Sequence, residues 1–316
     1  MGIINEPHQF DNNTSEIDMN APHSGIKTIV DLIRELLDLV IDSLDLDSLI
    51  NQKHSWKIRM HVMLSEIYTL ITYQIEQIEA VICLAETNLF HYPSAYVISR
   101  VVIETNLIIE WLLRHEEYSE IVLRYINYLN AQFYLTKTRN DYIDWSPTLS
   151  ESDRTDLRQE REDIIDDIRA MAQAAIDSGI LSEKISAIAE ADINSDISSN
   201  RQAEHPFSTL IDEFPSPKKM IKEIATEPRE KKLAINYYNS SKFVHSMRHA
   251  IIRHHTPWGL ESMNNPELKW NYPLEICIES IIASTQKLLQ RFQSDDLEQF
   301  NINSKTILEK LQKEIN

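Results

Sequence analysis

Glycine is scarce in this chain, and its scarcity restricts the possible folds more than any other feature of the sequence. The 316 residues contain four glycines, namely Gly2, Gly25, Gly179 and Gly259. A loop that cradles phosphate needs clustered glycines so that the backbone can approach the ligand closely, and none of these four has a second glycine nearby. The sequence therefore argues against nucleotide folds of the Rossmann or P-loop type and predicts no nucleotide cofactor.

Apolar residues recur at helical spacing through most of the chain, whereas the alternation typical of strands is not evident. We therefore predict an all-α fold, an irregular bundle of long antiparallel helices. Pro228 and Pro273 are each expected in the first turn of a helix, where the missing N–H is tolerated. The expected helices span about 26–50, 55–88, 94–115, 117–142, a charged stretch from 150 onward, 228–255, 273–289 and 297–316.

The pattern also predicts how the chain is organised. Residues 1–24 are polar, without a repeating apolar face, and are expected to form a flexible tail. Residues 25–316 are expected to form a single helical domain. Within it, residues 182–217 are rich in Ser, Asp and Asn, which predicts an irregular excursion with short helical pieces.

Charge, hydropathy and cysteine content limit the partners and the cellular compartment that we expect for this chain. The 49 acidic residues outnumber 31 Lys and Arg, for a net charge of −18, so an RNA partner would need a local basic patch. No apolar run reaches the roughly 20 residues that cross a bilayer, and the N-terminus lacks the pattern of a secretory signal. Cys83 and Cys277 lack metal-ligand spacing. We expect a cytoplasmic protein without membrane contact.

One charged pair stands within the most apolar predicted helix. Arg100 and Glu104 are four residues apart and therefore share a helix face, among apolar and aromatic neighbours. A buried ion pair rarely adds stability over apolar packing. The pair is therefore either a salt bridge that fixes helix register or part of a functional site.

A second feature is a local reversal of charge. No acidic residue occurs between Glu230 and Glu261, and four of the eleven histidines fall between residues 245 and 255. We call residues 241–255 the basic segment. Its candidate site residues, on the helix expected there, are Ser241, His245, Arg248, His249, His254 and His255.

Three interpretations of the basic segment remain open. Cations at a helix C-terminus complement the macrodipole, which accounts for the last turn but not for His245 and His249. These two histidines have the i, i+4 spacing of zinc ligands, although a third ligand is not evident nearby. Alternatively, imidazole exchanges protons with RNA while guanidinium holds the phosphate, a chemistry that needs no metal. We predict neither a metal nor a cofactor.

The two features together resemble a known protein family. The Arg100-x-x-x-Glu104 helix, followed by Tyr238-x-x-Ser241-x-x-x-His245, is similar to a bacterial domain-of-unknown-function family that pairs helices of these two patterns. The resemblance covers about half of the chain. It implies an all-helical fold and no particular activity.

The basic segment also resembles the R-x(4–6)-H motif of the HEPN superfamily, through Arg248 followed by His254 or His255. Members of that superfamily are helical bundles, many of them metal-independent ribonucleases, and often build their site at a dimer interface. The resemblance implies that Arg248 binds phosphate and that His254 or His255 exchanges protons. A polar residue commonly follows the arginine, and His249 fits that position.

We therefore expect a metal-independent ribonuclease in a toxin or phage-defence setting, with RNA as partner and a homodimer as its assembly. Arg100, Glu104, Ser241 and His245 would support the site, with Glu104 orienting an imidazole or pairing Arg248. Arg100 would then hold an anion. The alternative is a non-enzymatic helical interaction or scaffold protein, also homodimeric, in which the polar pairs are structural. A zinc hydrolase is a third possibility.

Overall fold

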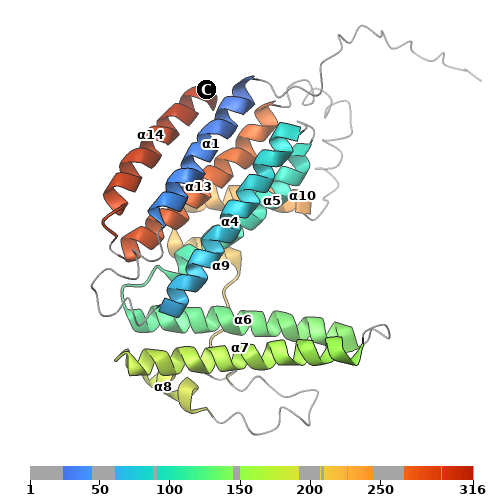
Figure 1. Ribbon diagram of the computed structural model, residues 1–316, viewed down its shortest axis with the longest axis vertical. Helices are drawn as coiled ribbons and strands as arrows, with labels where there is room; N and C mark the ends of the chain where they lie inside the picture. Colours follow the sequence, from blue (N-terminus) through green and yellow to red (C-terminus); the bar gives the residue numbers. More distant parts are fainter. Residues whose placement is uncertain are drawn as a thin grey trace, which may run out of the picture.

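In a computed structural model of the chain, the described residues form ten helices and no strand, which confirms the predicted all-α fold (Figure 1). The structure describes residues 24–44, 61–87, 91–144, 150–191, 207, 210–225, 227–244, 267–292 and 294–315. The helices are α1 (Ser24–Ser43), α4 (His61–Thr87), α5 (Tyr92–Leu112), α6 (Tyr118–Asp144), α7 (Glu151–Asp177), α8 (Glu183–Glu190), α9 (Pro217–Ile224), α10 (Glu227–Val244), α13 (Glu267–Arg291) and α14 (Leu297–Ile315).

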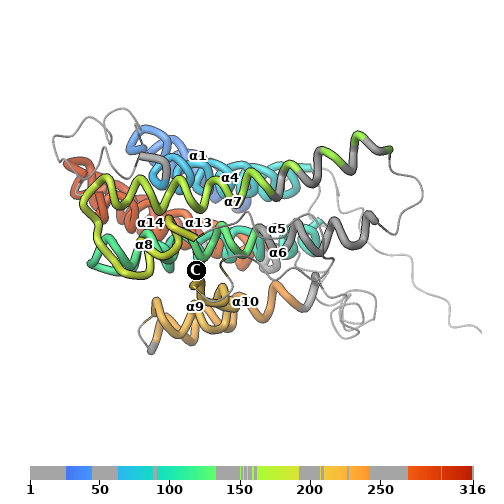
Figure 2. Tube along the Cα trace, turned by 90° about the horizontal axis from the view of Figure 1, so that it is seen from below, coloured from blue at the N-terminus to red at the C-terminus, as the bar shows by residue number. Residues whose placement is uncertain are grey.

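The helices are arranged in layers around α5. Seen from below, α1 and α4 lie on one side, α5 and α13 in the middle, and α9 and α10 on the other side (Figure 2). Helix α5 packs against α4, α13, α10 and α9. The hairpin of α6 and α7 lies crosswise at one end of this bundle, and α8 packs back against α7 (Figure 1). Helix α5 is therefore the element on which both sides of the bundle depend.

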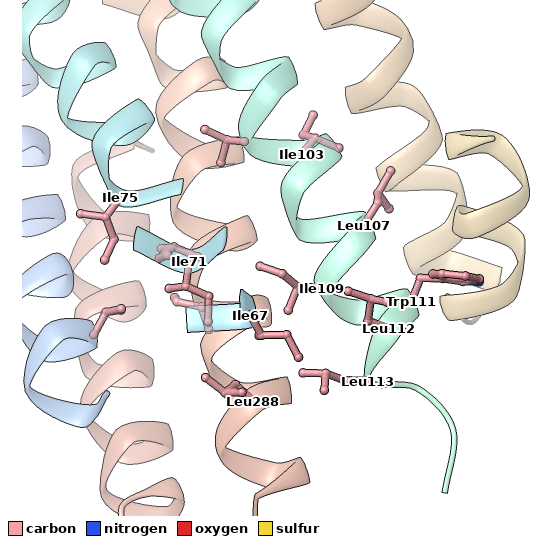
Figure 3. Packing of buried hydrophobic residues seen from close by; sticks show 14 of the residues in the cluster. Ile67, Ile71, Ile75, Ile103, Leu107, Ile109, Trp111, Leu112, Leu113 and Leu288 are labelled. Atoms are coloured by element: carbon pink, nitrogen blue, oxygen red, sulfur yellow. The ribbon is translucent and has the colours of Figure 1, made fainter. Parts of the chain in front are cut away.

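The sequence of α5 explains its central position. A helix with apolar residues on more than one face must be covered by neighbours on more than one side. The residues buried on α5 include Val102, Leu107 and Ile109, each with no exposed area. Figure 3 shows Ile109 on the side of α5 that faces the isoleucines of α4, and Leu107 on the opposite side. Burial of each such side chain contributes about 1.5–3 kcal/mol to the free energy of folding. The core therefore fixes the positions of the helices.

Helix α9 is fastened to the bundle by polar contacts. The carboxylate of Glu223 accepts a hydrogen bond from Trp111 Nε1 at 2.9 Å and lies 3.4 Å from the Arg124 guanidinium. Arg124 also donates to the carbonyl of Trp111 at 2.6 Å and stacks on its ring. A single carboxylate thus joins α9 to α5 and α6.

The prediction that Pro273 opens a helix is wrong. Pro273 lies inside α13, which begins six residues earlier at Glu267. A proline at an interior position removes one backbone hydrogen bond and disfavours the helix. Tertiary contacts offset that cost, because Trp270 is completely buried and the ring of Tyr272 stacks on Tyr96 of α5, with 5.3 Å between centroids.

Parts of the predicted organisation lie outside the described residues. These are 1–23 of the expected tail and 192–206 and 208–209 of the expected excursion. In the rest of the excursion, α8 buries Ile185 and Ile188 against the core. No helix in the described part of the chain is long and apolar enough to span a membrane.

Two carboxylates, Glu66 and Asp167, repel each other where α4 meets the α6–α7 hairpin, and this repulsion destabilises the folded state. Burial, and then the charge of Asp167 on α7, raise the pKa of Glu66 on α4 above its ordinary value of 4.5. A carboxyl whose pKa is raised in the folded state destabilises the fold when it is ionised. That penalty is complete above the folded pKa and disappears as the pH falls below the ordinary value.

We expect Glu66→Gln to raise the melting temperature at pH 7 by about 1–3 °C, because it removes this charge. The gain should disappear near pH 4, where the wild-type carboxyl is protonated in both states. Thermal unfolding followed by circular dichroism at both pH values measures the effect. Glu79→Gln, on the exposed side of the same helix, serves as control. An equal gain at both pH values would contradict the explanation.

Candidate functional site

Helices α5 and α10 lie antiparallel, and side-chain contacts fix their register. Arg100 of α5 meets Tyr237 of α10, whereas Glu110, further along α5, meets Arg229, which comes earlier on α10. Beside the Arg100–Tyr237 contact, on the side away from Glu110, Ser99 Oγ lies 3.5 Å from Ser240 Oγ. The described part of α10 therefore ends, at Val244, toward the N-terminal end of α5.

The predicted pair of Arg100 and Glu104 is present as an ion pair. Arg100 Nε donates to Glu104 Oε1 at 2.9 Å, and a terminal guanidinium nitrogen donates to the Tyr237 hydroxyl at 3.1 Å. The side chains are 17% and 35% exposed, so the pair lies at a wet edge of the bundle. Burial lowers the pKa of Arg100, but the hydrogen bond and charge of Glu104, with Tyr237, raise it overall. The Arg100 guanidinium therefore stays protonated beside α10, where its charge is paired with that of Glu104.

Tyr272 of α13 joins the same region. Its hydroxyl donates to Asn236 Oδ1 at 2.9 Å and accepts from Asn239 Nδ2 at 3.2 Å. Its ring stacks on Tyr96. These contacts hold three helices together around the Arg100 pair, and burial raises the pKa of Tyr96.

Of the remaining predicted site residues, the structure describes one and leaves five outside the described ranges. Ser241 is buried, and its Oγ donates to the carbonyl of Tyr237 one turn earlier at 2.6 Å, a common contact for a serine inside a helix. The structure thus gives Ser241 a local role on α10. The others lie outside the described residues: His245, Arg248, His249, His254 and His255.

A buried polar network further along α5 was not predicted. Glu110, with 7% of its side chain exposed, accepts hydrogen bonds from both terminal nitrogens of Arg229, at 2.7 Å for one of them. It also accepts from Asn106 Nδ2 at 3.0 Å, and Asn106 Oδ1 accepts from Ser284 Oγ of α13 at 3.0 Å. A single chain of hydrogen bonds therefore connects α10, α5 and α13.

The sequence did contain a signal for this network. Asn106 and Glu110 are four residues apart within an apolar run, the same spacing that drew attention to Arg100 and Glu104. Their partners, Arg229 and Ser284, are more than 100 residues distant. Sequence alone could have indicated that Glu110 needs a cation, but not which one.

The network forms the floor of a groove of about 770 Å³ between α5, α10, α13 and α14. Lys287 of α13 lines it, as does Arg114, just after α5. Burial lowers the pKa of Lys287, and the charges of Arg291, Arg114 and Arg229 lower it further, against the opposing effect of Glu110. The groove is thus electropositive, in a chain that is strongly acidic.

Metal ligands do not gather in the described part of the chain, where no group of three or more His, Cys, Asp or Glu is placed to hold an ion. Cys277 is buried, and burial raises the pKa of its thiol, which keeps it in the unreactive protonated form. The zinc interpretation of His245 and His249 falls outside the described residues.

We expect Arg229→Met to lower the free energy of unfolding by about 2–3 kcal/mol, because it leaves the buried Glu110 carboxylate without its cation. Chemical denaturation with linear extrapolation measures the loss. Lys184→Met breaks an exposed pair with Asp212 and should change stability by less than about 0.5 kcal/mol. Adding Glu110→Gln to Arg229→Met should recover part of the loss, and no recovery would contradict an electrostatic origin.

Comparison with known proteins gives one family and no activity. No curated protein and no solved structure matches the chain. A model described as a family of unknown function, DUF5677, matches residues 66–262, which include both the Arg100–Glu104 helix and the Tyr238 to His245 pattern. The resemblance to a family of unknown function is thereby confirmed, whereas the resemblance to the HEPN superfamily stays a hypothesis. The match covers well over half of the sequence, and the chain belongs to the DUF5677 family.

Proposed function

We propose that this protein is a metal-independent endoribonuclease, acting in a toxin or phage-defence setting, whose site combines the Arg100–Glu104 pair with the basic segment. Arg248 would bind the scissile phosphate, and His254 or His255 would exchange protons with the RNA. His249 would supply the polar group beside Arg248. The observation that carries the proposal is the contact of Arg100 with Tyr237, on the helix that leads directly into the basic segment.

That contact supports the proposal because it brings a fixed cation to a partly exposed edge of α10. Arg100 is held by Glu104 and Tyr237 rather than sealed within apolar side chains. Residues 231–260 contain no acidic residue, so a polyanion that approaches along α10 meets cations there despite the net charge of −18.

The proposed reaction is transesterification within the RNA. One imidazole removes the proton of a ribose 2′-hydroxyl, and the 2′-oxygen attacks the adjacent phosphorus. The bond to the 5′-oxygen breaks, and the same histidine of the second protomer in the expected homodimer, in its protonated form, supplies the proton that this leaving group needs. Arg248 stabilises the charge that develops on the phosphate oxygens. The products are a 2′,3′-cyclic phosphate and a free 5′-hydroxyl.

Because cleavage requires one neutral and one protonated group, we expect a bell-shaped pH profile near neutrality. The test incubates the purified full-length protein with end-labelled single-stranded RNA and with total RNA in excess EDTA. Arg248→Ala should reduce the cleavage rate by about 100-fold or more, as should His254→Ala or His255→Ala, whichever histidine acts. Mass spectrometry of the fragments should show cyclic phosphate ends.

His115→Ala is the matched control, since His115 is exposed at the turn between α5 and α6, and it should leave the rate unchanged. Arg100→Gln tests the supporting pair and should weaken RNA binding more than it slows single-turnover cleavage. Intact RNA under all conditions, with an unchanged circular dichroism spectrum, would overturn the proposal. That result would favour the non-enzymatic, homodimeric interaction protein, and cleavage only with added zinc would favour a metal hydrolase.

A further inference from the structure

The groove above the Glu110 network has the dimensions of a ligand site. Its volume of about 770 Å³ falls within the range of about 300–1,000 Å³ typical of small-molecule pockets. Apolar side chains from three helices form part of its wall, among them Ile103, Leu233 and Ile276. Charged and amide groups occupy the rest, which is the mixed lining that small organic ligands require.

Two of the four cations that line the groove already have carboxylate partners. Arg229 is paired with Glu110, and Lys232 is paired with Glu275 and Glu279. The other two are Lys287 and Arg114, and neither has a hydrogen bond or ion pair to any residue in the described ranges. Lys287 and Arg114 therefore remain without an ion-pair partner in the described part of the chain, although the charge of Glu110 acts on Lys287.

Lys287 is the less expected of the two, because its ammonium is half-buried. Removing a charge from water without a partner costs free energy, and three arginines nearby add repulsion, against the attraction of Glu110. A lysine with only a structural role would be expected to point into solvent or to meet a carboxylate. An anionic ligand would remove both the desolvation cost and the repulsion.

We propose that this groove binds a small organic phosphate, with Lys287 and Arg114 holding the phosphate and the apolar wall holding the organic part. A phosphate monoester carries a charge of about −1.5 to −2 at pH 7, and Lys287 and Arg114 are the two lining cations without an ion-pair partner among the described residues. Guanidinium presents paired donors that fit phosphate oxygens, and ammonium serves as a compact point charge. Gln290, one turn after Lys287, adds an amide to the same wall.

The groove has a different set of lining residues from the proposed ribonuclease site, because neither Arg100 nor Glu104 lines it. Helix α10 lines the groove through Arg229, Lys232, Leu233 and Asn236, whereas the basic segment begins at Ser241, in the last turn of α10. The inference does not rest on RNA cleavage, and its test uses no RNA. Failure of one proposal therefore leaves the other intact.

The test measures binding to the full chain by isothermal titration calorimetry and by thermal shift, with KCl at matched ionic strength as reference. The probes are butyl phosphate, inorganic phosphate and succinate. We expect butyl phosphate to bind about tenfold or more tightly than inorganic phosphate, because its alkyl group removes apolar surface from water. Succinate, which lacks the phosphate geometry, should bind more weakly than either.

Lys287→Met should weaken butyl phosphate binding by about tenfold or more, while the unliganded variant melts at a higher temperature than wild type because an unpaired charge has been removed. Arg114→Gln, at the exposed end of the groove, should also weaken binding without affecting folding. Lys305→Met, an exposed lysine of α14 outside the groove, is the matched control and should bind as wild type.

Each other outcome overturns a stated part of the proposal. Absence of binding by all three probes, or unchanged binding in Lys287→Met and Arg114→Gln, would remove the site. Equal affinity for inorganic and butyl phosphate would show that the apolar wall does not bind the alkyl group. The site would then be assigned to free phosphate. Succinate binding as tightly as butyl phosphate would overturn the choice of phosphate over carboxylate.

Discussion

The buried carboxylate of Glu110 is the constraint around which the centre of this fold is organised. It lies on α5, which packs against α4, α13, α10 and α9, and its charge requires cationic donors, which come from a neighbouring helix. Arg229 supplies them from α10, and Asn106 links the carboxylate to Ser284 on α13. Apolar packing could accept several small shifts of these helices, whereas the hydrogen bonds accept one register.

That register gives α5 and α10 two polar sites with different properties. At one end, Arg100 is paired with Glu104 and touches Tyr237 at a partly exposed edge. At the other end, the Glu110 network lies beneath a groove where Lys287 and Arg114 have no carboxylate partner among the described residues. Both sites thus hold cations in a chain of net charge −18, which suits them to anionic partners.

Local patterns predicted much of this. Helical spacing gave the all-α class and the approximate bounds of the long helices, and the i, i+4 rule gave the Arg100–Glu104 pair, because both depend on residues close in sequence. Pro273 was misplaced since its local preference for a first turn was outweighed by the packing of Trp270 and Tyr272. Residues 245–255, where the sequence concentrates its chemistry, lie outside the described residues, so their convergence remains a prediction.

The sequence by itself determined that the chain is helical, that α5 is its most apolar helix, and which residues could share a helix face. Tertiary structure alone decided that Glu110 meets Arg229, that Tyr237 meets Arg100, and that Lys287 lines the groove above Glu110. The physical reason is separation along the chain. Helix periodicity orders residues within a few turns, but a contact across more than a hundred residues depends on how whole helices pack.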